Sequence, residues 1–464
     1  MRCSRYLVAS VLLASSAGAQ TPDWPAVREE ALQTLVDLVK LDTSQPDGNE
    51  ILAARYLKKK LDAEGIPSEI FEPALGRASI VARVKGNGNK RPLLLLGHLD
   101  VVAVERGEWS FDPFGGVVKD GIIYARGAGD DKGVVAGSFQ TLLLLHRLKV
   151  PLDRDVIFLG VADEEAGGLR GITYLLEKHR DVIDAELAIN EGGSGVFDRD
   201  FQHIRFEIQT AEKTPRRIDL KAKGTSGHGS VPLADNPVAS LARAVARLSE
   251  YETPVHLNDT TREYFRRLAE RAPPEEAAVY NAVLAGNPSP ETQQKLRDLS
   301  PVYYSMIRTS IVPTIMKGGY LKNVIPSEAE ATIDIRALPS EDPEELFPRL
   351  KRIMNEPNVD LMPHPVTRPA HSPASLKSDV FLAFEKVLNK RYPGILILPR
   401  MSTGATDSAQ LRAAGIASYG FGPGRAVWDL SGGIHGKDEY LHVKPYQDYV
   451  EILYDVVVEV AGIK

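Results

Sequence analysis

Several short apolar runs in this chain each end beside a potential metal ligand. The runs and the residues that follow them are 93–97 with His98, 156–161 with Glu165, and 187–189 with Glu191. Runs of this length and composition are typical of strands buried in a parallel sheet. Because ligands of open α/β sheets bind outside the carboxyl ends of the strands, the pattern predicts an α/β fold with imidazole and carboxylate groups gathered at those ends.

The size and charge of the chain limit its fold and its partners. With 464 residues, 43% of them hydrophobic, the chain is long enough for roughly two or three domains. The net charge is −6 and no dense run of basic residues occurs, so nucleic acid is a poor candidate for a partner. After the N-terminus, no apolar stretch approaches the length needed to cross a bilayer.

The N-terminal segment, residues 1–19, has the features of a secretory signal peptide. Arg2 and Arg5 precede an apolar run, and small residues up to Ala19 form a cleavage site. We expect cleavage after Ala19 and export to the periplasm or the medium, without stable membrane insertion; an uncleaved anchor or a disordered tail are the alternatives. The only cysteine, Cys3, lies in this segment, so the mature chain would have no disulfide and no thiolate metal ligand.

The pattern of apolar residues predicts a discontinuous domain with a second domain inserted in it. Residues 22–210 and 341–464 alternate between helical and strand-like runs, which is typical of α/β layering. Near residue 200 strictly alternating runs begin, and we interpret residues 211–340 as a smaller α+β domain with helices on one face of its sheet. Residues 260–299 within it are charged, helical and interrupted by prolines, which predicts an inserted helical hairpin.

A histidine and a carboxylate lie close together in residues 96–100. His98 can bind a metal through one ring nitrogen while the Asp100 carboxylate orients the other nitrogen. The alternative is a strand-end pair that only forms a hydrogen bond. Alone, this motif is weak evidence for a metal site.

Three glycines surround Asp130 in residues 126–133, just before a long apolar run with helical spacing. They let the backbone turn sharply and bring Asp130 to the ends of the strands. A phosphate-binding loop is an alternative, but neither glycine-rich phosphate motif is present, and Asp130 and Asp131 would repel phosphate. N-capping of the helix is a second alternative and is compatible with metal ligation.

Three adjacent carboxylates, Asp163, Glu164 and Glu165, follow the second apolar run. Such carboxylates repel one another unless a cation or a proton is near. Because neighbouring side chains diverge, Glu165 can bind metal while Glu164 faces the substrate as a general base; a solvated turn is the alternative. His435 and His228 each lie in a glycine-rich segment, and each would mean little by itself.

Taken together, these motifs resemble those of the exopeptidase family that includes glutamate carboxypeptidase, aminoacylase, succinyl-diaminopimelate desuccinylase and the carnosine dipeptidases. The resemblance runs from about residue 30 to the C-terminus, with the motifs in the family's order. Residues 107–114 and the stretch from Arg308-Thr309 through residues 323–326 are most similar to the carboxypeptidase S type and its N-acyl amino acid hydrolase relatives.

The resemblance implies two zinc ions, for which cobalt or manganese could substitute, and a homodimer. The implied metal ligands are His98, Asp130 as the bridge between the ions, Glu165, Glu191 and His435. The implied catalytic residues are Glu164 as general base, Asp100 as the residue that orients His98, and His228, which would reach into the active site of a partner subunit. The implied substrate-binding residues are Asn323, Arg336, Gly404 and Thr406.

The resemblance also implies an α/β/α catalytic domain with an inserted ferredoxin-like lid, and hydrolysis of an amide bond in small peptides or N-acyl amino acids. A carboxypeptidase or dipeptidase is expected first, because Arg336 could pair bidentately with a substrate carboxylate; an exposed arginine without that role is the alternative. The alternative enzyme is an N-acyl amino acid amidohydrolase. An inactive metal-stabilised binding protein and a nucleotide-binding protein fit less well, since Glu164 is present and a phosphate loop is not.

Overall fold

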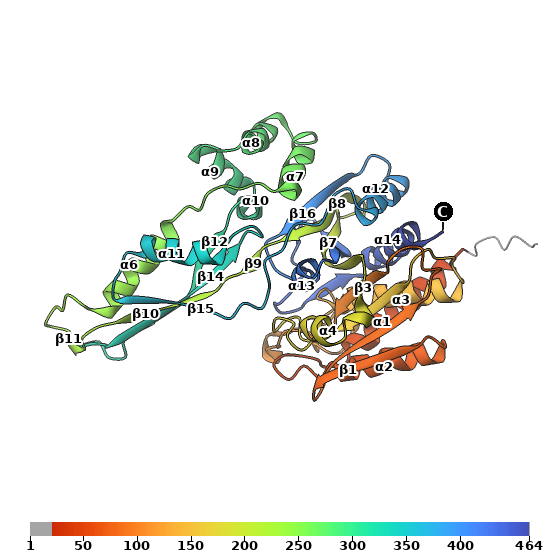
Figure 1. The fold of residues 1–464 in the computed structure, drawn as a ribbon, viewed down its shortest axis with the longest axis horizontal. Helices are drawn as coiled ribbons and strands as arrows, with labels where there is room; N and C mark the ends of the chain where they lie inside the picture. Colours follow the sequence, from red (N-terminus) through yellow and green to blue (C-terminus); the bar gives the residue numbers. More distant parts are fainter. Residues whose placement is uncertain (1–20, 464) are drawn as a thin grey trace, which may run out of the picture.

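The computed structural model describes residues 21–463, which form two domains (Figure 1). The predicted signal peptide, residues 1–19, lies outside the described residues. Within residues 21–463, no helix combines the length and the apolar character that a membrane crossing requires.

An eight-stranded mixed sheet forms the centre of the larger domain. In spatial order its strands are β1 (Ser68–Ala74), β2 (Arg77–Val84), β6 (Val156–Val161), β3 (Leu93–His98), β7 (Leu187–Phe197), β17 (Ala417–Ala426), β8 (His203–Glu212) and β16 (Leu396–Ser402). β3 runs parallel to β6 and β7, which confirms the parallel strands predicted from the apolar runs. A separate three-stranded sheet contains β18 (Tyr440–His442), β5 (Ile122–Tyr124) and β4 (Val117–Lys119).

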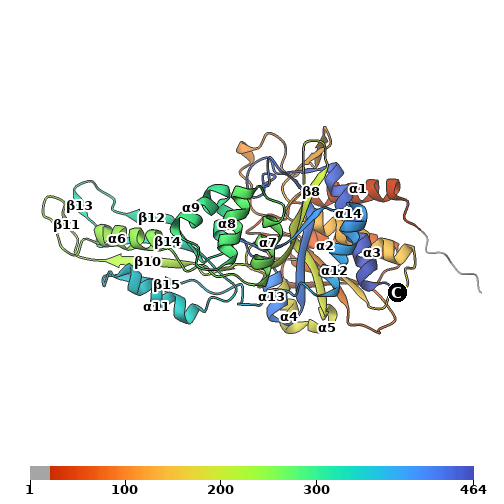
Figure 2. The same ribbon diagram turned by 90° about the horizontal axis from the view of Figure 1, so that it is seen from above.

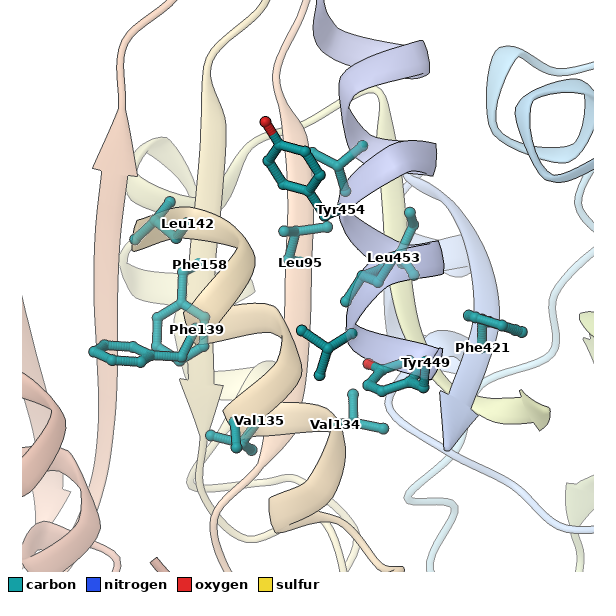
Figure 3. Close-up of a cluster of buried hydrophobic side chains, with 14 of the residues drawn as sticks. Leu95, Val134, Val135, Phe139, Leu142, Phe158, Phe421, Tyr449, Leu453 and Tyr454 are labelled. Atoms are coloured by element: carbon teal, nitrogen blue, oxygen red, sulfur yellow. The ribbon is translucent and has the colours of Figure 1, made fainter. Parts of the chain in front are cut away.

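Helices cover both faces of the large sheet. They are α1 (Trp24–Val39), α2 (Ile51–Ala63), α3 (Lys132–Arg147), α4 (Ile172–Lys178), α5 (Arg180–Ile183), α12 (Asp379–Arg391), α13 (Ser408–Ala413) and α14 (Val443–Ala461), with a 3-10 helix at Arg106–Glu108. Leu95 of β3 joins the apolar core under α1, α3 and α14 (Figure 3), whereas Leu94 and Leu96 join a second core under α4, α5 and α13. This alternation gives the α/β/α layering that was predicted.

The smaller domain is ferredoxin-like. Its elements in chain order are β10 (Ile218–Lys223), α6 (Pro237–Glu250), β12 (Ser310–Gly318), β14 (Glu328–Ala337), α11 (Pro343–Met354) and β15 (Val359–Pro363). This βαββαβ order, with strands arranged β12-β14-β10-β15, is the split βαβ pattern. The remaining short strands are β9 (Thr214–Pro215), which pairs with β14, and β11 (Gly227–His228), which pairs with β13 (Val324–Ile325) at the far tip (Figure 2).

The domain boundary predicted at residue 340 is wrong. α11 buries Leu346, Leu350 and Met354 in the core that it shares with α6, and β15 pairs with β10. The chain therefore returns to the larger domain only after β15. β8, near which the alternating pattern begins, belongs to the large sheet instead. An amphipathic or alternating pattern specifies a helix or a strand but not the core that its apolar side joins.

The segment predicted as a helical hairpin, residues 260–299, contains three helices, and a fourth follows it. They are α7 (Asp259–Ala269), α8 (Pro274–Leu284), α9 (Pro290–Leu299) and, after the segment, α10 (Pro301–Met306). The hairpin prediction is wrong because each proline break starts a new helix, with proline in its first turn. Phe265, Val283 and Leu296 share a core with Leu398 and Met401 of β16. The insertion therefore packs against the edge strand of the large sheet.

Close packing of α3 against α14 depends on Gly137. A Cβ at this position would lie 2.4 Å from Cε1 of the buried Tyr449. Figure 3 shows the Tyr449 ring on the side of α14 that faces α3. We expect Gly137→Ala to lower the free energy of unfolding by about 1–3 kcal/mol, the usual cost of overpacking, in denaturant titrations. Gly107→Ala is the matched control, because a Cβ on this exposed glycine meets nothing within 4 Å. Equal stability of the Gly137→Ala protein and its parent would contradict this account.

Candidate metal centre

Five predicted metal ligands converge at the carboxyl ends of the parallel strands. His98 ends β3, Asp130 lies just before α3, Glu165 follows β6, Glu191 lies in β7, and His435 lies in the loop between β17 and β18. Because β3 pairs with both β6 and β7 in parallel, the ends of these strands lie side by side. The loop with His435 closes the group from a distant part of the chain.

The ligands form two groups that share Asp130. One contains His98, Asp130 and Glu191, the other Asp130, Glu165 and His435, and the ligand atoms of each lie within 4.8 Å of one another. His98 Nε2 is 2.9 Å from Asp130 Oδ1, and His435 Nε2 is 3.2 Å from Asp130 Oδ2. Asp130 therefore directs one carboxylate oxygen into each group, which is the geometry of a ligand that bridges two ions.

The electrostatics of the centre suit divalent cations. Burial disfavours the charged form of His98, but hydrogen bonds with Asp100 and Asp130 raise its pKa well above the ordinary value. Hydrogen bonds with Asp130 and Glu165 raise the pKa of His435 to about 10. These carboxylates therefore attract positive charge strongly, and divalent ions would replace the imidazole protons on binding. The donor set of imidazole and carboxylate groups fits a divalent transition metal.

Each of the three adjacent carboxylates has its own cationic partner. Arg77 pairs with Asp163 at 2.6 Å, Arg368 pairs with Glu164, and His435 lies 3.1 Å from Glu165. Asp163 and Glu164 are buried, which excludes the solvated turn considered from the sequence. The sequence alone predicted that the three carboxylates need cations nearby. The two arginines were missed, because they lie far from the triplet in the sequence and in no recognisable motif.

Asp100 fixes the position of two strand ends. The Nδ1 of His98 donates to the backbone carbonyl of Asp100 at 2.9 Å, while the nearest carboxylate oxygen of Asp100 is 3.6 Å away. The carboxylate instead accepts the backbone N–H groups of Glu164 and Glu165, each at 3.1 Å, and the side-chain amide of Gln45 at 2.7 Å. Asp100 thus orients His98 mainly through its backbone, and its carboxylate holds the turn that contains Glu165.

The glycine-rich loop before α3 is held by a buried carboxylate. Glu439 accepts the backbone N–H of Gly129 at 2.8 Å and of Asp130 at 3.1 Å, and pairs with Arg126 at 2.7 Å. These N–H groups face a carboxylate, so the arrangement excludes a phosphate-binding loop. Asp131, not Asp130, precedes the first turn of α3, and no side-chain cap forms there. The N-cap interpretation of Asp130 is therefore wrong.

His228 and Asn323 lie together, away from the centre. Both are at the β11–β13 tip, which Figures 1 and 2 show at the end of the smaller domain farthest from the large sheet. The side chain of His228 is exposed and its Nδ1 lies 2.7 Å from Ser230 Oγ. The Asn323 carbonyl accepts the N–H of Gly229 at 2.8 Å. Within one chain, the structure does not bring these two residues to the metal ligands.

The other predicted substrate-binding residues lie near the junction of the domains. Arg336, at the end of β14 next to β9, pairs with Asp334 at 2.8 Å. Gly404 and Thr406 lie in the loop after β16. Thr406 donates its hydroxyl to the buried carboxylate of Glu212 at 2.8 Å, so the loop is fixed to the end of β8.

Comparisons with known proteins agree with this geometry. The sequence matches peptidase family M20/M25/M40 over residues 94–459. It is 28% identical to an N-fatty-acyl-amino acid synthase/hydrolase of Homo sapiens over 444 residues, covering 92% of this chain and 87% of the relative. It is 26% identical to a carboxypeptidase S-like protein of Dictyostelium discoideum, covering 82% of this chain and 74% of the relative.

Solved structures share the fold. An M20 family metallo-carboxypeptidase of Sulfolobus solfataricus superposes with a TM-score of 0.71 at 22% identity, covering 93% of this chain and 99% of that chain. Human carnosine dipeptidase 1 superposes with a TM-score of 0.66 at 16% identity, covering 94% of this chain and 98% of that chain. With two ligand groups that share one carboxylate, this chain belongs to peptidase family M20/M25/M40 and is a metal-dependent hydrolase of peptide or amide bonds.

Proposed function

We propose that this protein removes an amino acid with a free carboxylate from a peptide or an N-acyl amino acid, with two bound zinc ions and Glu164 as general base. The pair of ligand groups that share Asp130 carries the proposal. Glu164 would take a proton from the attacking water and deliver it to the leaving amine. The bound ions would activate water and polarise the scissile carbonyl.

The environment of Glu164 supports its role as the base. It directly precedes the ligand Glu165, and its side chain is buried. Burial raises the pKa of the Glu164 carboxyl, while the Arg368 guanidinium opposes that rise. A carboxylate whose affinity for protons is increased is a better general base near neutral pH. A metal site that only stabilises a fold has no use for such a group.

Zinc is the proposed metal because of the donor set. Two imidazoles and three carboxylates, without sulfur, can hold two zinc ions in the coordination that catalytic sites use. Cobalt or manganese could substitute with the same ligands.

A carboxypeptidase or dipeptidase is the first candidate for the specificity. Arg336 is positioned on the open face of the small sheet near the junction of the domains, and its guanidinium could pair with a substrate carboxylate in place of Asp334. Hydrolysis of N-acyl amino acids is the second candidate, and the similarity to the human N-fatty-acyl-amino acid synthase/hydrolase favours it. Both classes of substrate present a carboxylate close to the scissile amide.

A homodimer is proposed because His228 and Asn323 lie far from the metal ligands of their own chain. β12 is an edge strand of the small sheet, and Val312, Ile315 and Met316 on it are each about half exposed, at 50%, 48% and 50%. Long exposed edge strands with apolar side chains favour pairing with another chain. Pairing at the small domain would let each subunit present its tip to the other.

Export is proposed from the N-terminal residues alone. Arg2, Arg5 and the apolar run that follows them match a secretory signal that would be removed after Ala19.

Replacing the base should separate catalysis from metal binding. We expect Glu164→Gln to keep two equivalents of metal by elemental analysis, and kcat to fall by about 100-fold or more, the usual contribution of a general base. Glu177→Gln, on the exposed side of α4, is the matched control and should keep the parent kcat. Near-normal turnover of Glu164→Gln, or fewer than two metal equivalents in the parent, would remove this mechanism.

Arg336 is the proposed clamp for the substrate carboxylate, so the effect of replacing it should depend on whether the substrate has a free carboxylate. We expect Arg336→Ala to reduce kcat/KM about 10-fold or more for dipeptides and N-acetyl amino acids, because a hydrogen bond with a charged group contributes about 1.5–3 kcal/mol, but to reduce it little for the corresponding amides. Arg217→Ala is the matched control, since Arg217 pairs with the other oxygen of Asp334 at 2.9 Å. Equal loss for acids and amides would contradict the clamp.

Complementation between two inactive variants can test whether His228 acts in the active site of the other subunit. His228→Ala and Glu164→Gln proteins should each be nearly inactive, but after mixed refolding the heterodimer would hold one intact site. We expect a recovery of up to about one quarter of the parent activity, the share expected if subunits mix at random in closed dimers. No recovery, with heterodimers demonstrated by mass spectrometry, would place His228 outside the partner's active site.

A further inference from the structure

Arg368 connects two parts of the larger domain, the turn that contains Glu164 and the start of α13. It lies in the segment that returns from β15 to the larger domain, and only 4% of it is exposed. Its Nη2 donates to the carboxylate of Glu164 and, at 2.9 Å, to the backbone carbonyl of Glu164. Its Nη1 donates to Asp407 Oδ1 at 2.7 Å and to Gln410 Oε1 at 3.0 Å.

We propose that Arg368 is a positioning residue, which holds the Glu164 carboxylate in its working orientation and couples it to the substrate loop that contains Gly404 and Thr406. This inference rests on the proposed role of Glu164 as general base. The coupling runs through Asp407, the residue that follows Thr406.

The first argument is that Glu164 depends on Arg368 for its orientation. Within residues 21–463, Arg368 is the only side chain that donates a hydrogen bond to the Glu164 carboxylate. A base has to lie within hydrogen-bond reach of the proton that it removes, and small errors of position are costly. The two contacts from Nη2, one to the side chain and one to the backbone of the same residue, leave Glu164 little freedom.

The second argument is the geometry of the guanidinium. Its two terminal nitrogens serve two different carboxylates, those of Glu164 and Asp407. A planar fork can do this, whereas a lysine ammonium presents a single point charge on a flexible stem. The backbone of Arg368 is fixed as well, because Arg216 donates to its carbonyl at 2.9 Å.

A purely structural ion pair is the competing explanation, and a double-mutant cycle distinguishes the two. We expect Arg368→Gln to lower kcat about 10-fold or more for a dipeptide and an N-acetyl amino acid, with KM within about twofold and two metal equivalents retained. In the Glu164→Gln background, the same change should alter residual kcat by less than about twofold, because the group that it positions is already lost. Arg368→Lys should fall between Arg368→Gln and the parent.

The control is Arg154→Gln. Arg154 is also buried, at 1% exposure, and forms ion pairs with Glu186 and Asp379 at 3.2 and 3.1 Å, but it does not contact the metal ligands or Glu164. It should lower thermal stability and leave kcat unchanged. If Arg368→Gln fails to fold, two other variants replace it. Arg368→Lys is then compared with the parent, and Glu164→Gln/Arg368→Gln, in which no charge of the Glu164–Arg368 pair remains, is compared with Glu164→Gln.

The outcomes are separable. An additive loss in both backgrounds, loss of metal from Arg368→Gln, or parent-like kcat in the Gln and Lys variants would overturn the positioning role. Parent-like turnover of Glu164→Gln alone would overturn the proposed base instead, whatever Arg368 does.

Discussion

Carboxylates concentrated at the ends of buried strands are the constraint on which the rest of this structure depends. A buried carboxylate is tolerable only when it is paired or hydrogen-bonded. Glu439 is paired with Arg126, Asp163 with Arg77, and Glu164 with Arg368. The carboxylate ligands Asp130, Glu165 and Glu191 instead face one another and the two histidine ligands, so negative charge without an arginine partner gathers where the metal groups form.

The supporting groups act on backbone as well as on side chains. The Asp100 carboxylate accepts two consecutive N–H groups after β6, and Glu439 accepts two consecutive N–H groups before α3. Each carboxylate thereby fixes a loop that carries a ligand, Glu165 in one case and Asp130 in the other. Ligand positions in this centre are therefore set by buried hydrogen bonds between distant segments, and the loop sequences alone do not determine them.

The apolar runs were sufficient for the fold class and for the convergence of His98, Glu165 and Glu191, because they mark strand ends and parallel strands align those ends. The inclusion of His435 came only from the family resemblance, since its loop follows no such run. The sequence was insufficient where the answer depends on which surfaces meet. α11 has a clear amphipathic pattern, yet nothing in that pattern says that Leu346 packs under α6. The pairing of Arg77 with Asp163 and of Arg368 with Glu164 could not be predicted for the same reason, because only the tertiary fold brings an arginine to a particular carboxylate.

The connection between the two domains bears on where His228 can act. The segment that enters the smaller domain before β10 and the segment that leaves it after β15 are joined where Arg216 donates to the carbonyl of Arg368 at 2.9 Å. A rotation of the smaller domain about this junction would move the segment that contacts Glu164. Holding the junction still while a second subunit supplies the tip avoids that movement.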